Sequence, residues 1–321
     1  MIKLGILLTR QYRLLSVAAI LDVFESVNGF YRESGRPLPF SITMISPDAD
    51  VQATTFSNYP VLSVPAAGQL DLIMIPAFST ENIRIAIQDN GALIPWLKER
   101  FAGGTQIATF CTGAFLLGAT GMLNGRRATT HIDACEAFSL NFPDVCLMRD
   151  KIVTGDHGLF TSGGATSSFH LLLHLIKGFC GKEIAVRTAK LFAVDMDRVN
   201  QSYFGTFVPA QNHNDEIVAM AQRKIEAAYQ RGSTIEEMIK DVPASRRNIA
   251  RRFKLVTGLT PIEYLQKTRI EAAKRLLEQT NQQMLEIMLS SGYNDPKAFR
   301  KIFRKTVGMT PTGYRAKFQA A

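Results

Sequence analysis

The stretch FKLVTGLTP at residues 253–261 returns fifty positions later as FRKTVGMTP at residues 303–311. A tyrosine follows each copy at the same distance, Tyr264 after the first and Tyr314 after the second. Self-similarity at a fixed period indicates one structural unit that is built twice. The repeat therefore predicts a tandem module in the last third of the chain.

Each copy predicts two helices that are joined by a tight turn. In the first copy, a helix over 235–240 and a turn lead to Ser245, whose hydroxyl suits the N-cap of a second helix. In the second copy, a helix over 284–290 and a turn lead to Asp295, and Pro296 takes the first helical position. Apolar residues recur on one face of each second helix and cations on the other. This pattern is typical of a helix-turn-helix.

The positive charge of the chain lies entirely in this region. The sequence has 37 Lys and Arg against 28 Asp and Glu; residues 1–214 hold 17 of each, which leaves 20 basic and 11 acidic residues after them. The whole net charge of +9 therefore falls on residues 215–321, and it indicates a polyanionic partner. A cationic face that is merely solvated is the alternative, and it fits a single helix better than two copies at one period.

The segments RRFKLVTGLTPIEYLQKTRIEAAKRLLEQT and FRKIFRKTVGMTPTGYR resemble the AraC/XylS-type DNA-binding domain, over roughly residues 216–317. The resemblance implies base-reading positions at Arg247, Ala250, Arg251, Pro296, Lys297, Ala298 and Lys301. Arginine and lysine suit guanine edges, and alanine can contact a thymine methyl group. Asn248 shares the outward face, and Arg246, Arg300, Arg304 and Lys305 are expected to bind phosphates. Arg252 lies beside the packed face, so we expect a structural role for it.

Residues 1–195 alternate apolar, strand-like runs with amphipathic helical stretches, which predicts an α/β fold with a largely parallel sheet. Residues 196–214 lose this periodicity and gather Asn, Gln, Gly and Pro, as a linker would. From residue 215 the chain indicates helices throughout. The predicted strands are 2–8, 40–45, 70–75 and 105–110, with a hairpin at 151–155 and 158–161, and the predicted helices are 14–27, 81–101, 114–122, 132–140, 165–179 and 181–194.

The four cysteines, Cys111, Cys135, Cys146 and Cys180, form no C-x-x-C pair. Their spacing fits neither a zinc cluster nor a disulfide framework. We find no signal peptide and no apolar run that approaches the ~18 residues of a membrane span. The sequence therefore predicts a reduced, cytoplasmic protein without metal, cofactor or membrane.

Cys111 stands where a predicted strand turns sharply into a helix. Ligands of open α/β folds bind at this edge of the sheet. The helix end is expected to lower the pKa of the thiol and to favour an anion. His131 follows twenty residues later. The alternative reading makes Cys111 a small buried apolar residue and His131 an ordinary core histidine, and the spacing alone leaves both open.

The segments CTGAFLLGATGMLNGRRATTH, residues 111–131, and GLFTSGG, residues 158–164, resemble the DJ-1/PfpI superfamily. The resemblance implies a flavodoxin-like sandwich with Cys111 at a nucleophile elbow and His131 nearby. Enzymes of that superfamily carry a carboxylate where we align Ser16, and a glycine pair where this chain has Ala77 and Phe78. Thr112 replaces the histidine of the protease-like branch. We therefore expect a ligand pocket without catalytic residues, formed by Ser16, Ala77, Phe78, Cys111, Thr112 and His131.

Three other acids could substitute for the missing carboxylate: Asp22, Glu25 and Asp133. Their alternative reading is surface or helix-capping charge. A cysteine-dependent hydrolase, hydratase or glyoxalase-like enzyme fused to a DNA-binding domain thus remains the competing hypothesis. A third hypothesis is a nucleoid-type protein that binds DNA without sequence preference.

The two resemblances together point to the GlxA-like family of bacterial transcriptional regulators. We expect a sequence-specific regulator that acts as an activator. Residues 1–195 are expected to sense a small metabolite and to dimerise, and residues 215–321 to bind DNA. Residues 196–214 are expected to link these two domains. The expected partners are an operator in double-stranded DNA, a small-molecule effector, a second copy of the chain and RNA polymerase.

Overall fold

A computed structural model describes residues 1–47, 59, 61–80, 82–164, 166–198, 200–209 and 213–319. The chain divides into two compact units, Met1–Gln201 and Ser202–Ala321, and the boundary falls inside the segment that the sequence predicts as a linker. Glu81 and Ala165, at which two predicted helices begin, lie outside the described residues, as do 199 and 210–212 of the segment 196–214.

The first unit is built on a seven-stranded sheet in the order β3-β2-β1-β4-β5-β9-β8. Neighbouring strands run parallel except for the antiparallel pair β8–β9. A separate two-stranded pair, β6–β7, lies beside it. The strands are β1 Ile2–Leu7, β2 Phe40–Ser46, β3 Val61–Ser63, β4 Leu72–Ile75, β5 Gln106–Thr109, β6 Arg127–Ala128, β7 Cys146–Leu147, β8 Val153–Asp156 and β9 Leu159–Ser162.

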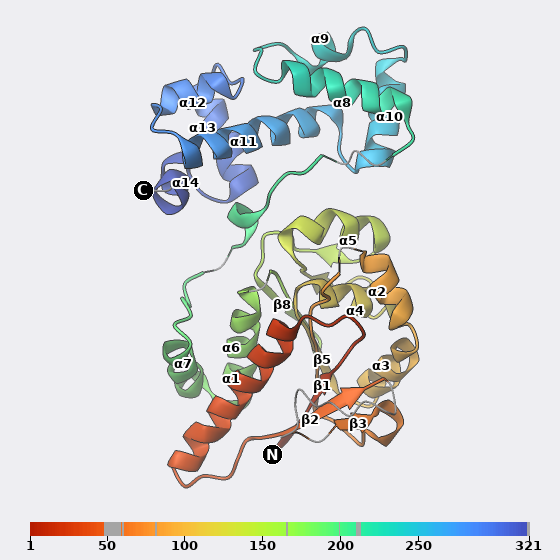
Figure 1. Ribbon diagram of the computed structural model, residues 1–321, viewed down its shortest axis with the longest axis vertical. Coiled ribbons are helices and arrows are strands. Elements are labelled where there is room, and N and C mark those ends of the chain that lie inside the picture. Colours follow the sequence, from red (N-terminus) through yellow and green to blue (C-terminus); the bar gives the residue numbers. More distant parts are fainter. Residues whose placement is uncertain are drawn as a thin grey trace. The chain divides into compact units, whose positions relative to one another are not determined.

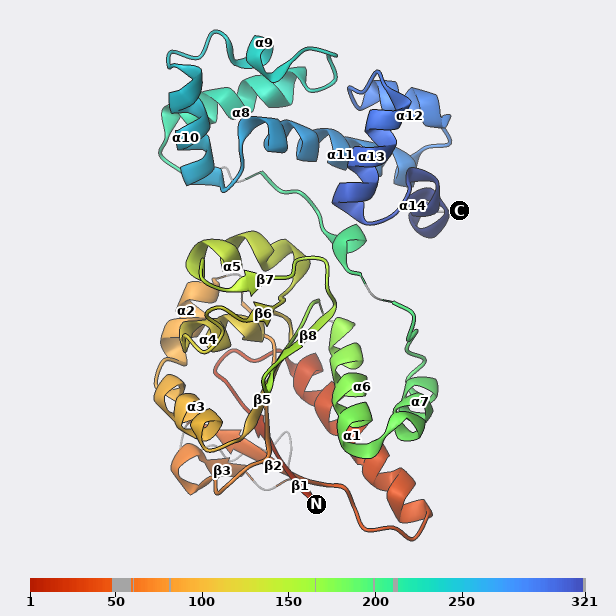
Figure 2. The ribbon, with the colours of Figure 1, turned by 180° about the vertical axis from the view of Figure 1, so that it is seen from behind.

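Helices cover both faces of this sheet (Figures 1 and 2). One layer contains α1 Leu14–Glu33, α6 Ser167–Cys180 and α7 Lys182–Leu191, and the other contains α2 Ile83–Asp89, α3 Leu93–Ala102, α4 Ala114–Ala119 and α5 Cys135–Asn141. Successive strand residues point to opposite faces: Leu72 and Met74 of β4 join the core beneath α1, and Ile73 and Ile75 join the other core. This flavodoxin-like α/β sandwich confirms the predicted fold class.

Helix α1 is the one described helix that is long and apolar enough to cross a membrane. Most of its apolar side chains are buried inside the first unit. Val17, Ile20, Phe24 and Val27 are fully buried in the core between α1 and the sheet. The length and composition of α1 are therefore explained by a core helix.

The described part of the second unit is helical, with seven α-helices and one short 3₁₀ turn (Figure 1). They are η5 Ser202–Phe204, α8 Glu216–Ala228, α9 Ile235–Ile239, α10 Arg246–Thr257, α11 Pro261–Gln279, α12 Met284–Ser290, α13 Pro296–Val307 and α14 Pro311–Phe318. The pairs α9–α10 and α12–α13 are the two predicted helix-turn-helix units. The all-α character of this part is therefore confirmed as well.

The repeated Gly-x-Thr-Pro sequence ends one helix and starts the next. Gly258 stops α10 in the left-handed region, at φ +73°, which costs a glycine little. The hydroxyl of Thr260 then caps α11 by accepting the N–H of Glu263, with Pro261 at the first helical position. Gly308, Thr310 and Pro311 repeat this arrangement between α13 and α14.

The repeated tyrosines fasten each unit to the helix that precedes it. The hydroxyl of Tyr264, on α11, donates to Glu226 on α8. The hydroxyl of Tyr314, on α14, donates to Glu278 on α11. Helix α11 therefore closes the first helix-turn-helix unit with Tyr264 and opens the second with Glu278.

Three residues of the predicted linker are anchored within their own units. Gln201 is 1% exposed in the first unit. Tyr203 is buried in the second unit with residues of α11, α12, α13 and α14, and the ring of Phe207 packs on Tyr264, with 5.2 Å between ring centroids. One residue, Ser202, thus separates a buried side chain of the first unit from a buried side chain of the second.

Candidate DNA-binding surface and ligand cavity

The recognition helix of the first helix-turn-helix unit, α10, presents its polar face to solvent. The Ser245 hydroxyl caps it by accepting the N–H of Asn248 at 3.3 Å. Arg247 and Arg251 are exposed, and Asn248 and Ala250 are half-buried beside them. The Arg251 guanidinium donates to the amide oxygen of Asn248 at 3.4 Å. These four predicted DNA contacts therefore lie on one accessible surface.

The recognition helix of the second helix-turn-helix unit is α13. It carries more cations on its outer face than α10 does. The Asp295 carboxylate caps it by accepting the N–H of Lys297 at 2.8 Å. Among its predicted DNA contacts, Ala298 is half-buried and the others are exposed: Pro296, Lys297, Arg300, Lys301 and Arg304. Phe299 and Phe303 face the core on the opposite side. The structure thus brings these residues together on the outer face of one helix.

Two arginines of α10 are engaged in ion pairs. Arg246, predicted to bind phosphate, pairs with Glu236 of α9 at the surface. Arg252, predicted to be structural, donates to the carboxylate of Asp215 at 2.8 Å. Asp215 also caps α8 by accepting the N–H of Val218. The hydrogen bond from Arg252, together with the N–H of Val218, holds the pKa of Asp215 below its ordinary value.

A groove runs beside each recognition helix, next to the start of the following helix. The groove at α13 has a volume of about 740 Å³, and the groove at α10 about 630 Å³. The α13 groove is lined by Met284, Arg300, Lys301, Arg304, Lys305, Thr310, Pro311 and Thr312. Its four cations contrast with the α10 groove, where Arg246 and Arg269 are accompanied by Glu236. The α13 groove is therefore the more electropositive surface.

Arg269 of α11 joins the turn between α12 and α13 to the connection between α8 and α9. Its Nε donates to the carbonyl of Tyr229 at 2.8 Å, and its guanidinium lies 5.5 Å from the centre of the Tyr293 ring. A side chain at Gly292, where φ is +84°, would lie 2.1 Å from the same Tyr229 carbonyl. The second helix-turn-helix unit is thus fixed to the end of α8 by this contact, in addition to its connection to the first through α11. The sequence analysis did not predict this contact. Its one signal in the sequence is the glycine that precedes Tyr293 in the turn between α12 and α13.

Cys111 occupies a strained elbow at the carboxyl edge of the sheet of the first unit. It follows β5 with φ +52°, which is unfavourable for a residue with a side chain. Gly113 makes the close turn possible, because a Cβ there would lie 2.5 Å from the Pro76 carbonyl oxygen. Residues 111–113 form the short 3₁₀ turn η3 Cys111–Gly113 that leads into α4.

The expected lowering of the Cys111 pKa is wrong. The residue is 7% exposed, and burial raises the pKa of its thiol. Hydrogen bonding with Thr112 and the charge of Arg13 act in the opposite direction without outweighing the burial. The helix end therefore does not lower the pKa of this thiol below its ordinary value.

Cys111 opens into a small cavity of about 160 Å³. Four of the six residues predicted for the pocket line it: Ser16, Ala77, Cys111 and His131. Sequence reasoning missed the other lining residues, which are Arg13, Leu15, Ala19, Ser168 and Phe169. Of the three alternative acids, Asp133 approaches the site, 3.9 Å from the Nδ1 of His131, and Asp22 and Glu25 are absent from the lining that the structure describes.

The remaining two predicted residues, Phe78 and Thr112, lie beside the cavity and bind each other. The N–H of Phe78 donates to the Thr112 hydroxyl at 2.9 Å. The N–H of Ala77 donates to the Ser16 hydroxyl at 3.3 Å. Both backbone donors at the position of the enzymes' glycine pair are therefore already occupied by side chains of this chain.

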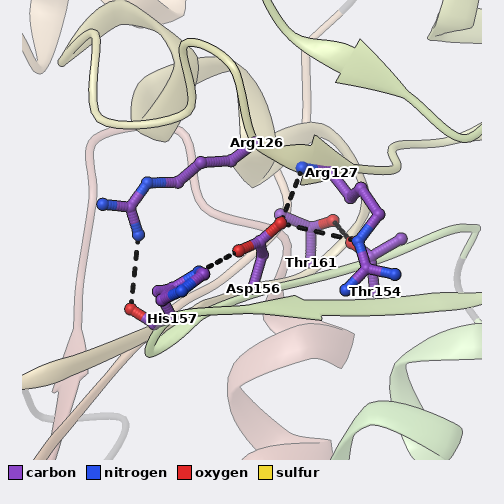
Figure 3. A network of polar contacts seen from close by, with 6 residues as sticks. All are labelled: Arg126, Arg127, Thr154, Asp156, His157 and Thr161. Atoms are coloured by element: carbon purple, nitrogen blue, oxygen red, sulfur yellow. Dashed lines mark hydrogen bonds and ion pairs between the residues drawn. The ribbon is translucent and has the colours of Figure 1, made fainter.

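Polar side chains of the β8–β9 hairpin hold the segment that leads to His131 (Figure 3). The carboxylate of Asp156 accepts the backbone N–H of Arg127 at 3.1 Å. The hydroxyl of Thr161 accepts the backbone N–H of Thr129 at 2.7 Å. The hydrogen bond from His157, followed by that from Arg127, lowers the pKa of Asp156 to about 2. Asp156 therefore stays ionised and holds Arg127, while Thr161 holds Thr129.

Gln201 connects this segment to the end of the first unit. Its side-chain nitrogen lies 3.0 Å from the carbonyl oxygen of Thr130, and its side-chain oxygen accepts the N–H of Gly164 at 3.2 Å. The hydroxyl of Thr130 donates in turn to the Cys111 carbonyl at 2.9 Å, and Gly164 packs against the ring of His131. The last residue of the first unit therefore contacts the immediate neighbours of the cavity.

Comparisons with known proteins agree with both halves of this description. The DJ-1/PfpI family matches residues 58–178, and a helix-turn-helix domain family matches residues 238–317. The HTH-type transcriptional regulator GbdR of Pseudomonas aeruginosa is 25% identical over 98% of this chain and 84% of its own length. GlxA of Rhizobium meliloti, named likewise, is 25% identical over 98% of this chain and 95% of its own. The solved structure of an AraC family transcriptional regulator from Pseudomonas putida shares the fold, with a TM-score of 0.50 and 19% identity over 60% of this chain and all of its own.

The tandem helix-turn-helix units and their basic faces define a DNA-binding transcriptional regulator. The chain thus combines a DJ-1/PfpI family domain with a C-terminal helix-turn-helix domain, and it is similar over 98% of its length to the transcriptional regulators GbdR and GlxA.

Proposed function

We propose that this regulator reads an operator with α10 and α13 and responds to a small metabolite in the Cys111 cavity. The observation that carries the proposal is the pair of exposed basic helix faces, held at a fixed spacing by α11 and Arg269. Successive major grooves on one side of B-DNA are ~34 Å apart, and the proposal requires α10 and α13 to match that spacing. Arg247, Arg251 and Lys301 would contact bases, and Arg246, Arg300 and Arg304 would contact phosphates.

Selecting bound duplexes from a random pool tests the DNA part of the proposal. We expect one recurring sequence with two sub-sites, one for each recognition helix. Equal affinity for the selected and random duplexes, measured at a stated salt concentration, would instead identify a nucleoid-type binder without sequence preference.

We propose that the cavity binds a ligand and does not catalyse a reaction. Three observations support this: the Cys111 thiol has a raised pKa, Ser16 offers no carboxylate, and the N–H groups of Ala77 and Phe78 are occupied. Oxyanion stabilisation and an acid-base partner are large terms in acyl and carbonyl chemistry. Steady turnover of a hydrolase, hydratase or glyoxalase substrate that disappears in Cys111→Ser would favour the enzyme hypothesis.

Gln201 is our candidate for the connection between ligand and DNA. A ligand can shift a conformational equilibrium only when it binds one state better than the other. Gln201 contacts the surroundings of Cys111 and His131, and Ser202 alone separates it from the buried Tyr203. A ligand that displaces Thr130 or Gly164 would loosen Gln201, and the second unit would gain freedom relative to the first.

Gln201→Ala tests this connection when DNA binding is measured with and without a panel of metabolites. We expect the variant to bind the selected duplex but to lose the ligand response. The matched control is Gln69→Ala, because Gln69 is an exposed glutamine of the same unit. An unchanged ligand response in Gln201→Ala would exclude this residue as the connection.

We further propose that the protein acts in the cytoplasm as a homodimeric activator and contacts RNA polymerase. The support is the architecture that it shares with its relatives. Light scattering of the full chain, with and without its selected duplex, measures the number of copies. Transcription from a promoter that carries the selected site measures the sign of regulation.

A further inference from the structure

The cavity beside Cys111 is lined by one arginine, and no aspartate or glutamate is among its described lining residues. Arg13 supplies a guanidinium group, which stays protonated at neutral pH. Ser16 and Ser168 contribute hydroxyl groups, and His131 contributes an imidazole ring. The nearby carboxylate of Asp133 faces the Nδ1 of His131, which also accepts the N–H of Asp133. The cavity is therefore suited to an anion.

The hydroxyl of Ser16 is positioned to bind that anion. Ser16 is 6% exposed, and its oxygen already accepts the N–H of Ala77. A hydroxyl that accepts a hydrogen bond keeps its own proton for donation. Ser168, 4% exposed, adds a second hydroxyl from the first turn of α6. Arg13 and these two hydroxyls form the polar part of the lining.

The apolar part of the lining and the volume restrict what else the ligand can contain. Leu15, Ala19 and Phe169 line the cavity together with Ala77. A cavity of about 150 Å³ holds a molecule of roughly benzene size, and this one measures about 160 Å³. The lining therefore fits an anionic group on a short organic chain better than a bare inorganic anion.

The thiol of Cys111 leaves the cation of Arg13 available. Burial raises the pKa of Cys111, so at neutral pH the sulfur carries no charge that would pair with Arg13. A ligand that carries a negative charge can therefore pair with Arg13 without competition from the sulfur. A guanidinium group binds a carboxylate through parallel N–H donors, which is a strong and directional interaction.

We propose that the effector is a small monocarboxylate of about six non-hydrogen atoms. Its carboxylate binds Arg13 and accepts hydrogen bonds from Ser16 and Ser168, and its short chain lies against Leu15, Ala19 and Phe169. This assignment rests on the proposed ligand-sensing function and specifies the chemistry of that same cavity.

Calorimetric titration of the full-length protein tests the assignment with four carboxylates: acetate, propionate, lactate and alanine. We expect at least one of them to bind, and its neutral amide and inorganic phosphate to bind at least tenfold more weakly. Arg13→Gln should weaken the carboxylate at least tenfold and leave the amide unaffected. Arg84→Gln, which changes an exposed arginine on α2, is the control and should bind like the wild type.

Ser16→Glu provides an independent test, because it places a carboxylate of the protein inside the cavity. We expect this variant to lose carboxylate binding while its far-UV circular dichroism and its affinity for the selected duplex are retained. Unaltered carboxylate binding in both Arg13→Gln and Ser16→Glu would overturn the assignment, as would equal affinity for the amide.

The same measurements separate this assignment from the proposed function. Carboxylate binding that leaves the affinity for DNA unchanged would support the site and contradict its regulatory role. A neutral metabolite that alters DNA binding, in the absence of any carboxylate binding, would support the regulatory role and overturn the assignment.

Discussion

The two helix-turn-helix units share an interior and differ on their outer faces. Phe253 and Phe303 are both fully buried, and Tyr264 and Tyr314 close both cores in the same way. On the outside, α10 offers arginines, one of them paired with Glu236, whereas α13 begins with Pro296 and gathers cations along its groove. The comparison teaches that inward positions determine this fold and outward positions are free to specialise.

Removing a large buried phenylalanine from either helix-turn-helix unit should cause the largest loss of stability. Phe253→Ala and Phe303→Ala should each lower the free energy of unfolding of the second unit by about 3–5 kcal/mol, because each leaves a large cavity. Urea denaturation followed by far-UV circular dichroism measures the loss. Leu255→Ala is the control, since this side chain is 74% exposed and should cost less than about 0.5 kcal/mol. A much smaller loss in one unit would show that the two cores are not equivalent.

Removing one base-reading cation from each unit should relax sequence preference in one sub-site only. We expect Arg247→Ala to cost about 1–3 kcal/mol of discrimination, because a guanidinium can bind a guanine edge with two donors. Lys301→Ala should cost less, because an ammonium lacks that fork. Competition binding against duplexes with single base changes measures both effects. Uniform weakening on all duplexes would contradict the base-reading assignment.

The predicted phosphate contacts of the two helix-turn-helix units should differ in their contribution to DNA affinity because of Glu236. Arg304→Ala should weaken all sequences alike and reduce the salt slope by about one. Arg246→Ala should reduce the slope by less, because its guanidinium already pairs with Glu236. Glu236→Gln should increase the affinity for every duplex. Binding titrations over a series of salt concentrations test all three variants, and equal slopes for both arginine variants would contradict the role given to Glu236.

Acid should lower the stability of the first helix-turn-helix unit through the ion pair of Asp215 and Arg252, which the second helix-turn-helix unit lacks. The hydrogen bond from Arg252 lowers the pKa of Asp215, and the position fifty residues after Arg252 is Ile302. A lowered carboxyl pKa stabilises the folded state above the unfolded value of about 4, and this stabilisation is lost as pH falls through the folded pKa. The stability difference between wild type and Asp215→Asn, measured by urea denaturation, should therefore shrink towards zero in acid. A difference that stays constant with pH would exclude the ion pair as its source.

Periodic features of the fold were predictable from the sequence. The fifty-residue repeat, the Gly-x-Thr-Pro boundaries and the apolar strands all depend on local spacing, and the structure contains each of them. The position of Cys111 on an elbow was also predictable, because a strand followed by CTGAF dictates a sharp turn. Helix ends shifted by a few residues, and the single helix predicted over 81–101 is two helices, α2 and α3. The short strands β3 and β7 were missed because two or three residues carry no period.

Features that depend on contacts between distant residues were not predictable. The pKa of Cys111 follows its burial, which only the packed fold determines. The contact of Arg269 with Tyr229 joins positions forty residues apart. Gln201 and Tyr203 are isolated anchors in a segment without periodicity, so the sequence suggested a linker where the structure has buried side chains.

The double role of α11 limits how this protein can change. Tyr264 near its start and Glu278 near its end must each face a different neighbour. Inserting one residue between them would rotate everything that follows by about 100° and advance it by about 1.5 Å. Both tyrosine anchors could not then be kept, and α13 would meet the wrong side of the double helix. If α10 and α13 bind DNA as proposed, the length of α11 sets the distance between the two contacts, and sequence preference can change through side chains on α10 and α13 while that length stays constant.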